Sequence, residues 1–296
     1  MDKLLHENIT CEQHEDKYNI SSSAYFGILI VLKQKPNKDC TSIIDIINNA
    51  NENFAFIISL FNDKNIEALE IASKNPKFTD FMIINIDNNW QDVINVLKTG
   101  HIKILSIRNC YMDTEEASKI SPYLDKIDNI IFNACNISEN NFKKYLDVCN
   151  NIKSLSIYNQ TFEYEHVEHI LLFIENTKIK ELNLSGNIED GLLAIIYAFR
   201  FNKFIKKIYI CFAFISSTVL KAYNTLLTFN KTLIDIDTGD EIYNNLITQK
   251  LEENRQLLKK RINEIENIGC MLMHSEVKIS QNVINEFLQF GKNMLI

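Results

Sequence analysis

Glycine and proline are scarce in this chain, which has 7 and 3 of them among its 296 residues. Both residues concentrate in linkers and irregular loops, so their scarcity excludes a long flexible linker and favours regular secondary structure. Long apolar runs are also missing. The longest, AYFGILIVL at 24–32, has about half the length needed to cross a bilayer, so we read it as a buried strand and expect no membrane partner.

The sequence has no basic stripe of the kind that neutralises phosphates along a nucleic acid. Lysine and arginine are scattered and the net charge is −7, so we expect no nucleic-acid partner. The 7 cysteines are irregularly spaced and form no CxxC pair, which excludes a zinc ribbon and a thioredoxin site. Free thiols and the absence of a signal peptide's apolar core favour a cytoplasmic protein.

Catalytic motifs are missing as well. The chain has no phosphate-binding loop, no nucleophile elbow and no zinc-protease helix. His166 and His169 stand three residues apart on a predicted helix, but no third ligand is near, so we interpret them as surface residues rather than metal ligands. We expect no catalytic residue, no metal and no cofactor, and therefore a protein that is not an enzyme.

What the chain does contain is a recurring apolar spacing. In IKELNLSGN (179–187) the first, fourth and sixth places are apolar and the ninth is asparagine. Similar segments begin at residues 102, 127, 152 and 205, looser ones at 55, 81 and 233, and a first copy near Gly27 with Ile30 and Leu32. The fourth-place residues are Ile58, Ile84, Leu105, Ile130, Leu155, Leu182, Ile208 and Ile236. One step between them, 21 residues, is short and predicts a shortened connection at 89–100.

Helical patterns fill the gaps between these segments. The ranges 138–151, 164–176 and 217–230 carry apolar residues at helical spacing, with Ser138 as a possible cap. Their inward faces are expected to be Phe142, Tyr145, Leu146, Cys149, Val167, Ile170, Leu171, Ile174, Val219, Ala222, Leu226 and Phe229. A strand of roughly four residues alternating with a helix of about a dozen, at a constant period, predicts one unit stacked many times.

With this period, the chain resembles leucine-rich repeats of the ribonuclease-inhibitor type. The resemblance rests on IKILSIRNC, IDNIIFNAC, IKSLSIYNQ and above all IKELNLSGN. It implies an α/β solenoid curved like a horseshoe, with short parallel strands on the concave face and helices on the convex face. We expect repeats over 25–246, between an N-terminal cap at 1–24 and a C-terminal helical cap at 247–296.

The ninth place has a structural role in such a unit. Its side chain can bond to backbone groups in the turn after the strand, where polar groups would otherwise lack hydrogen-bond partners. Asn187, Cys110 and Cys135 are the expected positions, and we interpret the two cysteines as structural thiols rather than reactive ones.

Side chains at the third, fifth and seventh places should point outward on the concave face, because side chains alternate along a strand. The third-place residues Ile57, Ile83 and Ile104 should make its N-terminal part apolar, unless the N-terminal segment covers them. The middle should be small and polar, and the far end charged. Eight strands span roughly 34 Å, which suits a protein partner better than a metabolite. The expected partner-binding residues are Phe61, Arg108, Ile131, Tyr158, Glu181, Tyr209, Asp235 and Asp237.

The leading hypothesis is a monomeric scaffold that binds another protein through its concave face. Repeats with this asparagine-, isoleucine- and lysine-rich character also resemble host-directed effectors of intracellular bacteria, which implies secretion into the host cytoplasm and a role in virulence. The alternative is a GTPase-activating protein of leucine-rich-repeat type, in which Arg108 would act on the nucleotide of a small GTPase. A ubiquitin-ligase adaptor is a third option, but no F-box-like N-terminal helix pair is visible.

Overall fold

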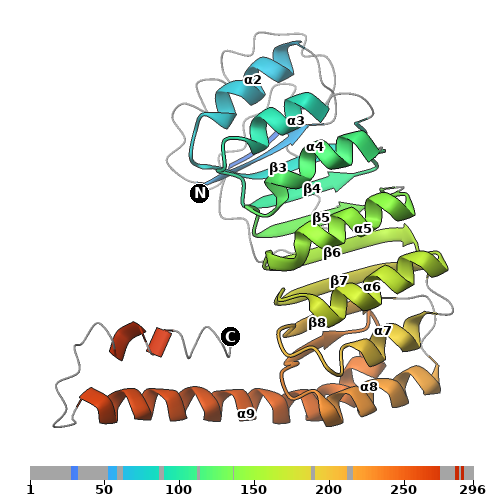
Figure 1. Ribbon diagram of the computed structural model, residues 1–296, viewed down its shortest axis with the longest axis vertical. Coiled ribbons are helices and arrows are strands. Elements are labelled where there is room, and N and C mark those ends of the chain that lie inside the picture. The colour runs from blue at the N-terminus through green and yellow to red at the C-terminus, as the bar shows by residue number, and fades with distance from the viewer. Residues whose placement is uncertain are drawn as a thin grey trace.

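The strands in the described part of the chain form a single parallel sheet, and helices alternate with them along the sequence (Figure 1). The computed structural model describes residues 28–32, 53–58, 63–86, 90–111, 114–135, 137–187, 191–211, 216–273, 284–286 and 288–289. The α/β class predicted from the sequence is therefore confirmed. The expected N-terminal cap at 1–24 and the candidate residue Phe61 lie outside the described residues.

The order of the strands in the sheet is their order in the sequence, and each pairs in parallel with the next. The strands are β1 (Ile28–Leu32), β2 (Phe54–Ile58), β3 (Phe78–Ile84), β4 (Ile104–Arg108), β5 (Asn129–Asn133), β6 (Ser154–Thr161), β7 (Glu181–Asn187), β8 (Lys207–Cys211) and β9 (Asp235–Asp237). The helices are α2 (Asp63–Ser73), α3 (Trp90–Leu97), α4 (Thr114–Leu124), α5 (Glu139–Val148), α6 (Tyr164–Asn176), α7 (Leu192–Ala198), α8 (Ser217–Phe229) and α9 (Glu241–Met273), with a 3₁₀ turn η1 (Cys149–Asn151) after α5.

The core lies between the sheet and helices α2 to α8, which follow one another along one face (Figure 1). In β4 to β8 the fourth- and sixth-place residues predicted from the repeat are all buried, as Leu105 and Ile107 illustrate. One continuous cluster of buried side chains runs from Phe54 to Leu251. Because each fully buried aliphatic side chain contributes about 1.5–3 kcal/mol, and each unit shares its buried faces with two neighbours, stability builds up along the stack.

The register of β3 differs from the prediction. Phe81 pairs with Leu105 and Ile83 with Ile107, so the fourth place of this unit is Phe81 and not Ile84. In β2 the fourth place is likewise Phe56, whereas the early copy with Ile30 and Leu32 was placed correctly. The aligned fourth-place residues are Ile30, Phe56, Phe81, Leu105, Ile130, Leu155, Leu182, Ile208 and Ile236.

The corrected alignment removes the irregular step. Successive fourth-place residues are 26, 25, 24, 25, 25, 27, 26 and 28 apart, so the 21-residue step was a register error. The connection at 89–100 holds a short helix, α3, of 8 residues. Because the β3 error was an odd number of residues, it exchanged the two faces of the strand. Ile83, expected on the concave face, is in the core instead.

The backbone supports the same register independently. At the eighth place of successive units the chain adopts positive φ, between 48° and 56°, which turns it out of the sheet. These residues are Asn85, Asn109, Ala134 and Asn159. Asparagine tolerates this left-handed conformation better than other side chains, which explains three of the four. In β7 the place belongs to Gly186 (φ 157°), where an added Cβ would lie 1.9 Å from the carbonyl oxygen of Gln160.

A second set of hydrogen bonds joins the helix ends. Asn202, Asn230 and Asn254, which we call the asparagine ladder, are buried, and each donates to two backbone carbonyls of the preceding unit. The Nδ2 atom of Asn230 lies 2.7 Å from the carbonyl oxygen of Phe199, and its Oδ1 accepts from the backbone N–H of Leu233 at 3.1 Å. These side chains satisfy backbone groups that a helix end leaves without partners.

Helix α9 is the longest element and begins earlier than expected. It spans Glu241–Met273, 33 residues, so the proposed boundary between 246 and 247 falls inside it. Its first part packs on α8 and β9, and its second part projects beyond the edge of the sheet (Figure 1). Helical turns also occur at 284–286 and 288–289. Among the described residues, no helix is both long and apolar enough to cross a membrane.

The predicted helices are present, with two differences in detail. Ser138 occupies the position before α5, but its side chain makes no capping hydrogen bond. Phe229, expected to face inward from α8, is 54% exposed. It is stacked instead against Arg200, whose guanidinium carbon lies 3.6 Å from the centroid of its ring. A cation over an aromatic face is attracted to it, which accounts for the outward orientation.

Replacing Ala134 by glycine should stabilise the protein. Ala134 is exposed and held at φ 52°, a conformation that disfavours alanine and suits glycine. We expect a gain of about 0.5–1 kcal/mol in the free energy of unfolding, measured by urea denaturation. The exposed Ala194 of α7 is the matched control, because Ala194→Gly should cost about 1 kcal/mol in a helix. A loss in both variants would show that the turn is not left-handed.

Removing a residue of the asparagine ladder should be strongly destabilising. Asn230→Ala leaves backbone groups on both sides of the turn buried without partners, so we expect a loss of about 3–5 kcal/mol in chemical denaturation. Asn176→Ala removes a hydrogen bond on the exposed surface of α6 and should change stability by less than about 0.5 kcal/mol. Equal effects of the two substitutions would contradict the structural role of the ladder.

Candidate functional site

The face of the sheet opposite the helices carries the side chains predicted to bind a partner. We call the third-, fifth- and seventh-place side chains of β4 to β9 the open face. Ile131, Tyr158, Glu181 and Tyr209 are half-buried on it, and Asp235 and Asp237 are exposed. In β5, β7, β8 and β9, half-buried or exposed side chains of this face alternate with buried core residues, whereas Ser106 in β4 and Ser156 in β6 are buried at the fifth place. The candidate residues named above therefore lie on the predicted face, and their role in binding stays a prediction.

Two tyrosines meet at the centre of the open face. The rings of Tyr158 in β6 and Tyr209 in β8 are 6.4 Å apart between centroids and inclined at 72°, an edge-to-face arrangement. They contact each other across β7, because the strand between them carries only the small side chains of Asn183 and Ser185 at these places. Asn183 is itself fixed, since its Nδ2 donates to Ser156 Oγ at 2.9 Å. The pair is thus a preorganised aromatic surface with polar surroundings.

At the charged end of the face, Asp235 and Asp237 interact with other residues of the chain. Asp235 lies 3.6 Å from Arg255 of α9. Asp237 Oδ1 accepts from the backbone N–H of Gly239 at 2.8 Å and from Asn244 Nδ2 at 2.9 Å. Both carboxylates therefore help to hold the turn between β9 and α9. Their assignment as partner-binding residues overlooked this structural role, because their partners are in a helix that the repeat pattern does not cover.

The N-terminal strands β2 and β3 carry apolar side chains on the same side of the sheet, but these side chains are buried. Ile57 and Met82 are each 7% exposed and pack with Ile84 in a small cluster separate from the main core. The third place in β3 is Asp80, where burial raises the pKa of the carboxyl group and a hydrogen bond from Thr79 Oγ1, at 2.9 Å, opposes that rise. The expectation of an exposed isoleucine row was wrong, since Ile83 is in the core and Ile57 is covered.

Arg108 lies at the end of β4, where the GTPase-activating alternative requires a free guanidinium. It is half-buried and interacts within the chain. An arginine that inserts into a partner's nucleotide site needs to extend freely from the surface. The position of Arg108 therefore does not favour that alternative, which stays a prediction.

The two ninth-place cysteines bond to backbone groups as predicted. Cys135 Sγ donates to the carbonyl oxygen of Ile107 at 3.3 Å, and Cys110 Sγ accepts from the backbone N–H of Ile86 at 3.4 Å and donates to the carbonyl oxygen of Arg108 at 3.0 Å. Burial raises the pKa of Cys110 to about 12 and also raises the pKa of Cys135. Both thiols are thus held protonated, as structural groups. The side chain of Asn187 lies outside the described part of the chain.

His166 is not a surface residue. It is buried, its Nδ1 accepts from the backbone N–H of Glu163 at 3.1 Å, and its Nε2 lies 3.2 Å from the carbonyl oxygen of Ile137. One ring nitrogen therefore bonds to the start of α6, and the other contacts the preceding unit. Within the described residues, no group of three or more histidine, cysteine or acidic side chains could hold a metal ion.

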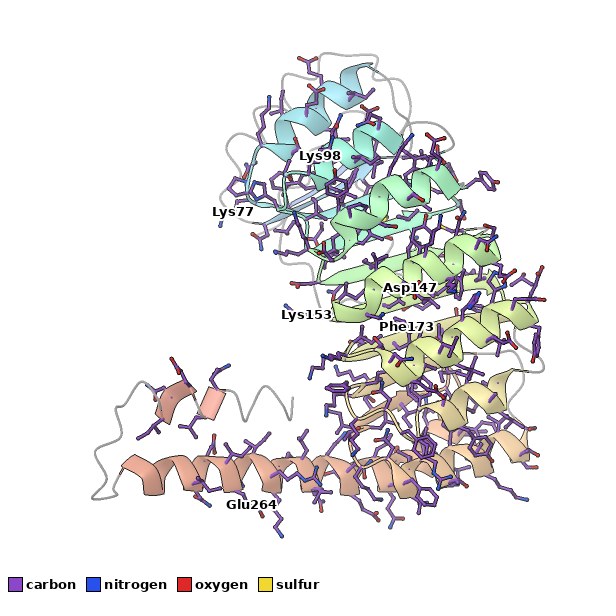
Figure 2. All side chains as sticks on the ribbon, viewed as in Figure 1. Lys77, Lys98, Asp147, Lys153, Phe173 and Glu264 are labelled. Atoms are coloured by element: carbon purple, nitrogen blue, oxygen red, sulfur yellow. The ribbon has the colours of Figure 1, made fainter. Side chains whose placement is uncertain are left out.

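A row of lysines along one edge of the sheet was missed. The second-place residues precede the strands, and each accepts a backbone hydrogen bond from the next: Lys180 N donates to Lys153 O at 2.9 Å and Lys206 N to Lys180 O at 2.8 Å. We call Lys103, Lys153, Lys180 and Lys206 the basic edge; Figure 2 labels Lys153 on it. Successive members are 26 to 50 residues apart in sequence, so only an alignment of the units at their second place could have revealed it.

Comparison with known proteins adds little to this picture. No protein-family model matches the chain, and no curated protein sequence does. Among solved structures, the chain is similar to two crystal forms of an N-acetylneuraminate lyase from Mycoplasma synoviae, at 8% and 9% sequence identity and a TM-score of 0.28 for both. The similarity covers 90% of this chain and 96% and 97% of the lyase chains.

This comparison corrects the expectation that the chain is not an enzyme. The two solved structures named above are those of an enzyme, so a non-enzymatic character is not maintained. The TM-score of 0.28 carries no argument for lyase activity in this chain either.

The buried thiols should react slowly in the native protein. With the pKa of Cys110 raised from 9.0 to about 12, the thiolate fraction at mildly alkaline pH falls roughly a thousandfold. We expect iodoacetamide to leave the peptides that contain Cys110 and Cys135 unmodified in native protein and to modify them fully in urea, as measured by mass spectrometry. Rapid labelling of either cysteine without denaturant would contradict the structural assignment.

Proposed function

We propose that the chain is a leucine-rich-repeat solenoid of the ribonuclease-inhibitor type that binds another protein through its open face. The observation that carries this proposal is the Tyr158–Tyr209 pair at the centre of that face. Tyrosine is among the residue types that most often dominate binding energy, particularly near the centre of an interface. Here the two rings are held by each other and by the sheet, so ordering them on binding costs little entropy.

The arrangement of the units supports the solenoid part of the proposal. Strands follow one another in sequence order, with a unit length of 24 to 28 residues, and the turn after each of several strands has the same left-handed residue. The ninth-place cysteines bond to the preceding unit, as this type of repeat implies. All of these features are typical of a stack in which each unit contacts only its neighbours.

The dimensions of the open face favour a protein as partner. From β4 to β9 the sheet extends over roughly 24 Å, at about 4.8 Å per strand. A standard interface buries about 800 Å² on each partner, so adjoining turns would take part. Tyr158 and Tyr209 would then form the central contact, with Ile131 and Glu181 around them. Arg108, half-buried at the end of β4, belongs to the margin.

The compartment and assembly state belong to the same proposal. Cys110, Cys135 and Cys149 are free thiols, which fits a reducing cytoplasm. We propose that the protein acts there as a monomer, and that, if it is an effector as the resemblance implies, this is the cytoplasm of a host cell.

Substitution of the two central tyrosines should strongly weaken partner binding. We expect Tyr158→Ala/Tyr209→Ala to weaken the complex by about 2 kcal/mol or more, roughly thirtyfold, because the central aromatic surface is lost. Partners would be captured from a eukaryotic lysate with the wild-type chain, identified by mass spectrometry, and measured individually by surface plasmon resonance.

The control for that experiment is a second pair of tyrosines on the helical face. Tyr164 and Tyr197 are 72% and 45% exposed on α6 and α7, so Tyr164→Ala/Tyr197→Ala removes the same two side chains from another surface. The proposal requires that a partner be lost with the first pair and retained with the second. Retention of every partner by the Tyr158/Tyr209 variant would place the binding surface elsewhere.

A further inference from the structure

Three cations meet where the basic edge reaches helix α9. Lys206 precedes β8, Lys180 precedes β7, and the two are joined by the hydrogen bond from Lys206 N to Lys180 O. Arg261 comes from α9, which projects past this edge of the sheet (Figure 1). The three side chains thus come from three separate segments of the chain.

The position of α9 is fixed at this edge by a hydrogen bond of its own. Arg255 Nε donates to the carbonyl oxygen of Ile234 at 2.8 Å. Ile234 N in turn donates to Lys206 O at 2.9 Å, so Arg255 continues the same row of backbone hydrogen bonds beyond the last strand. Arg261 lies six residues, less than two turns, farther along the helix and is close enough for its charge to act on Lys206.

Lys206 is an unusual lysine because it is only 6% exposed. Its ammonium group has three donors, and the described residues supply one acceptor, the carbonyl oxygen of Lys203 at 3.3 Å. Lysine is almost never this deeply buried unless it is paired with an opposite charge. In the described part of the chain no carboxylate lies within 4.0 Å of Lys180, Lys206 or Arg261.

Lys153 shows that a lysine at this place of a unit can pair with a carboxylate. Lys153 occupies the same place in its own unit, and its Nζ lies 3.0 Å from Asp128 Oδ2. At Lys206, by contrast, the neighbouring charges are of the same sign. Burial, and to a lesser degree the like charges of Lys180 and Arg261, lower the pKa of Lys206 to about 8. Near neutral pH the group is still mainly protonated, so the free protein holds a charge that its own fold disfavours.

We propose that Lys206, Lys180 and Arg261 form a binding site for a phosphate group. A phosphate has enough oxygens to accept from three cations that approach from different segments, and the planar guanidinium of Arg261 can donate two parallel hydrogen bonds to it. Binding would supply the acceptors and the negative charge that Lys206 lacks. The site lies at the edge of the sheet, away from the open face, and does not depend on the function proposed for that face.

Phosphate binding should be measured by isothermal titration calorimetry at neutral pH and about 0.15 M ionic strength, where distant surface charges are screened. Inorganic phosphate and a phosphoserine-bearing peptide would be titrated separately, with the unphosphorylated peptide as reference. Comparable binding of both probes would identify free phosphate or a small phosphorylated molecule as the ligand. Binding of the phosphopeptide alone would identify a phosphorylated protein segment.

Three substitutions decide the assignment. Lys206→Met and Arg261→Gln should each weaken binding about tenfold or more, since each removes a charge-assisted hydrogen bond. Lys153→Met should leave it unchanged, because Lys153 is already paired with Asp128. Without phosphate, Lys206→Met should also raise the melting temperature, because a buried unpaired charge is removed.

The result that would overturn the proposal is equally definite. If neither probe binds the wild-type chain, or if Arg261→Gln binds as tightly as wild type, there is no phosphate site at these three residues. Arg261 is exposed on α9, so Arg261→Gln should fold whatever happens to Lys206→Met, and this variant alone is sufficient to decide.

Discussion

Parallel pairing of every strand with the one before it, in a single register, is the constraint on which the rest of the structure depends. It brings equivalent places of successive units side by side, so the fourth and sixth places form the core and the third, fifth and seventh form the open face. It also aligns the left-handed eighth-place turns, the ninth-place cysteines and the second-place lysines. A slip of one residue in any strand would exchange its two faces and break these rows.

This constraint explains both what the sequence reveals and where it misleads. In IKELNLSGN polar residues separate the apolar ones, so only one register fits. In β3 the residues Phe81, Met82, Ile83 and Ile84 are all apolar, and the pattern accepts either face. Pairing with β4 decides between them, because it aligns Ile83 with Ile107. Asn85 could have indicated the same register, because asparagine also occupies the left-handed eighth place of other units.

The candidate sites show the same division. The Tyr158–Tyr209 pair follows from strand alternation, and each place could be predicted, but the contact across β7 depends on the small side chains between them. Asp235 and Asp237 were assigned to binding because the residues that hold them, Arg255 and Asn244, belong to α9. The basic edge and the asparagine ladder were missed because their members are about one repeat apart. A linear search for charge clusters does not find such rows, whereas alignment of the units does.

The central claim is tested most directly at two neighbouring residues of β3. Ile83 is buried in the main core and Ile84 is only partly buried on the opposite face, so an aspartate should be tolerated very differently at the two positions. We expect Ile83→Asp to abolish cooperative thermal unfolding, since burying an unpaired charge costs several kcal/mol, while Ile84→Asp still unfolds in one cooperative transition. The reverse result, with Ile83→Asp folded and Ile84→Asp unfolded, would contradict the register on which the whole stack is built.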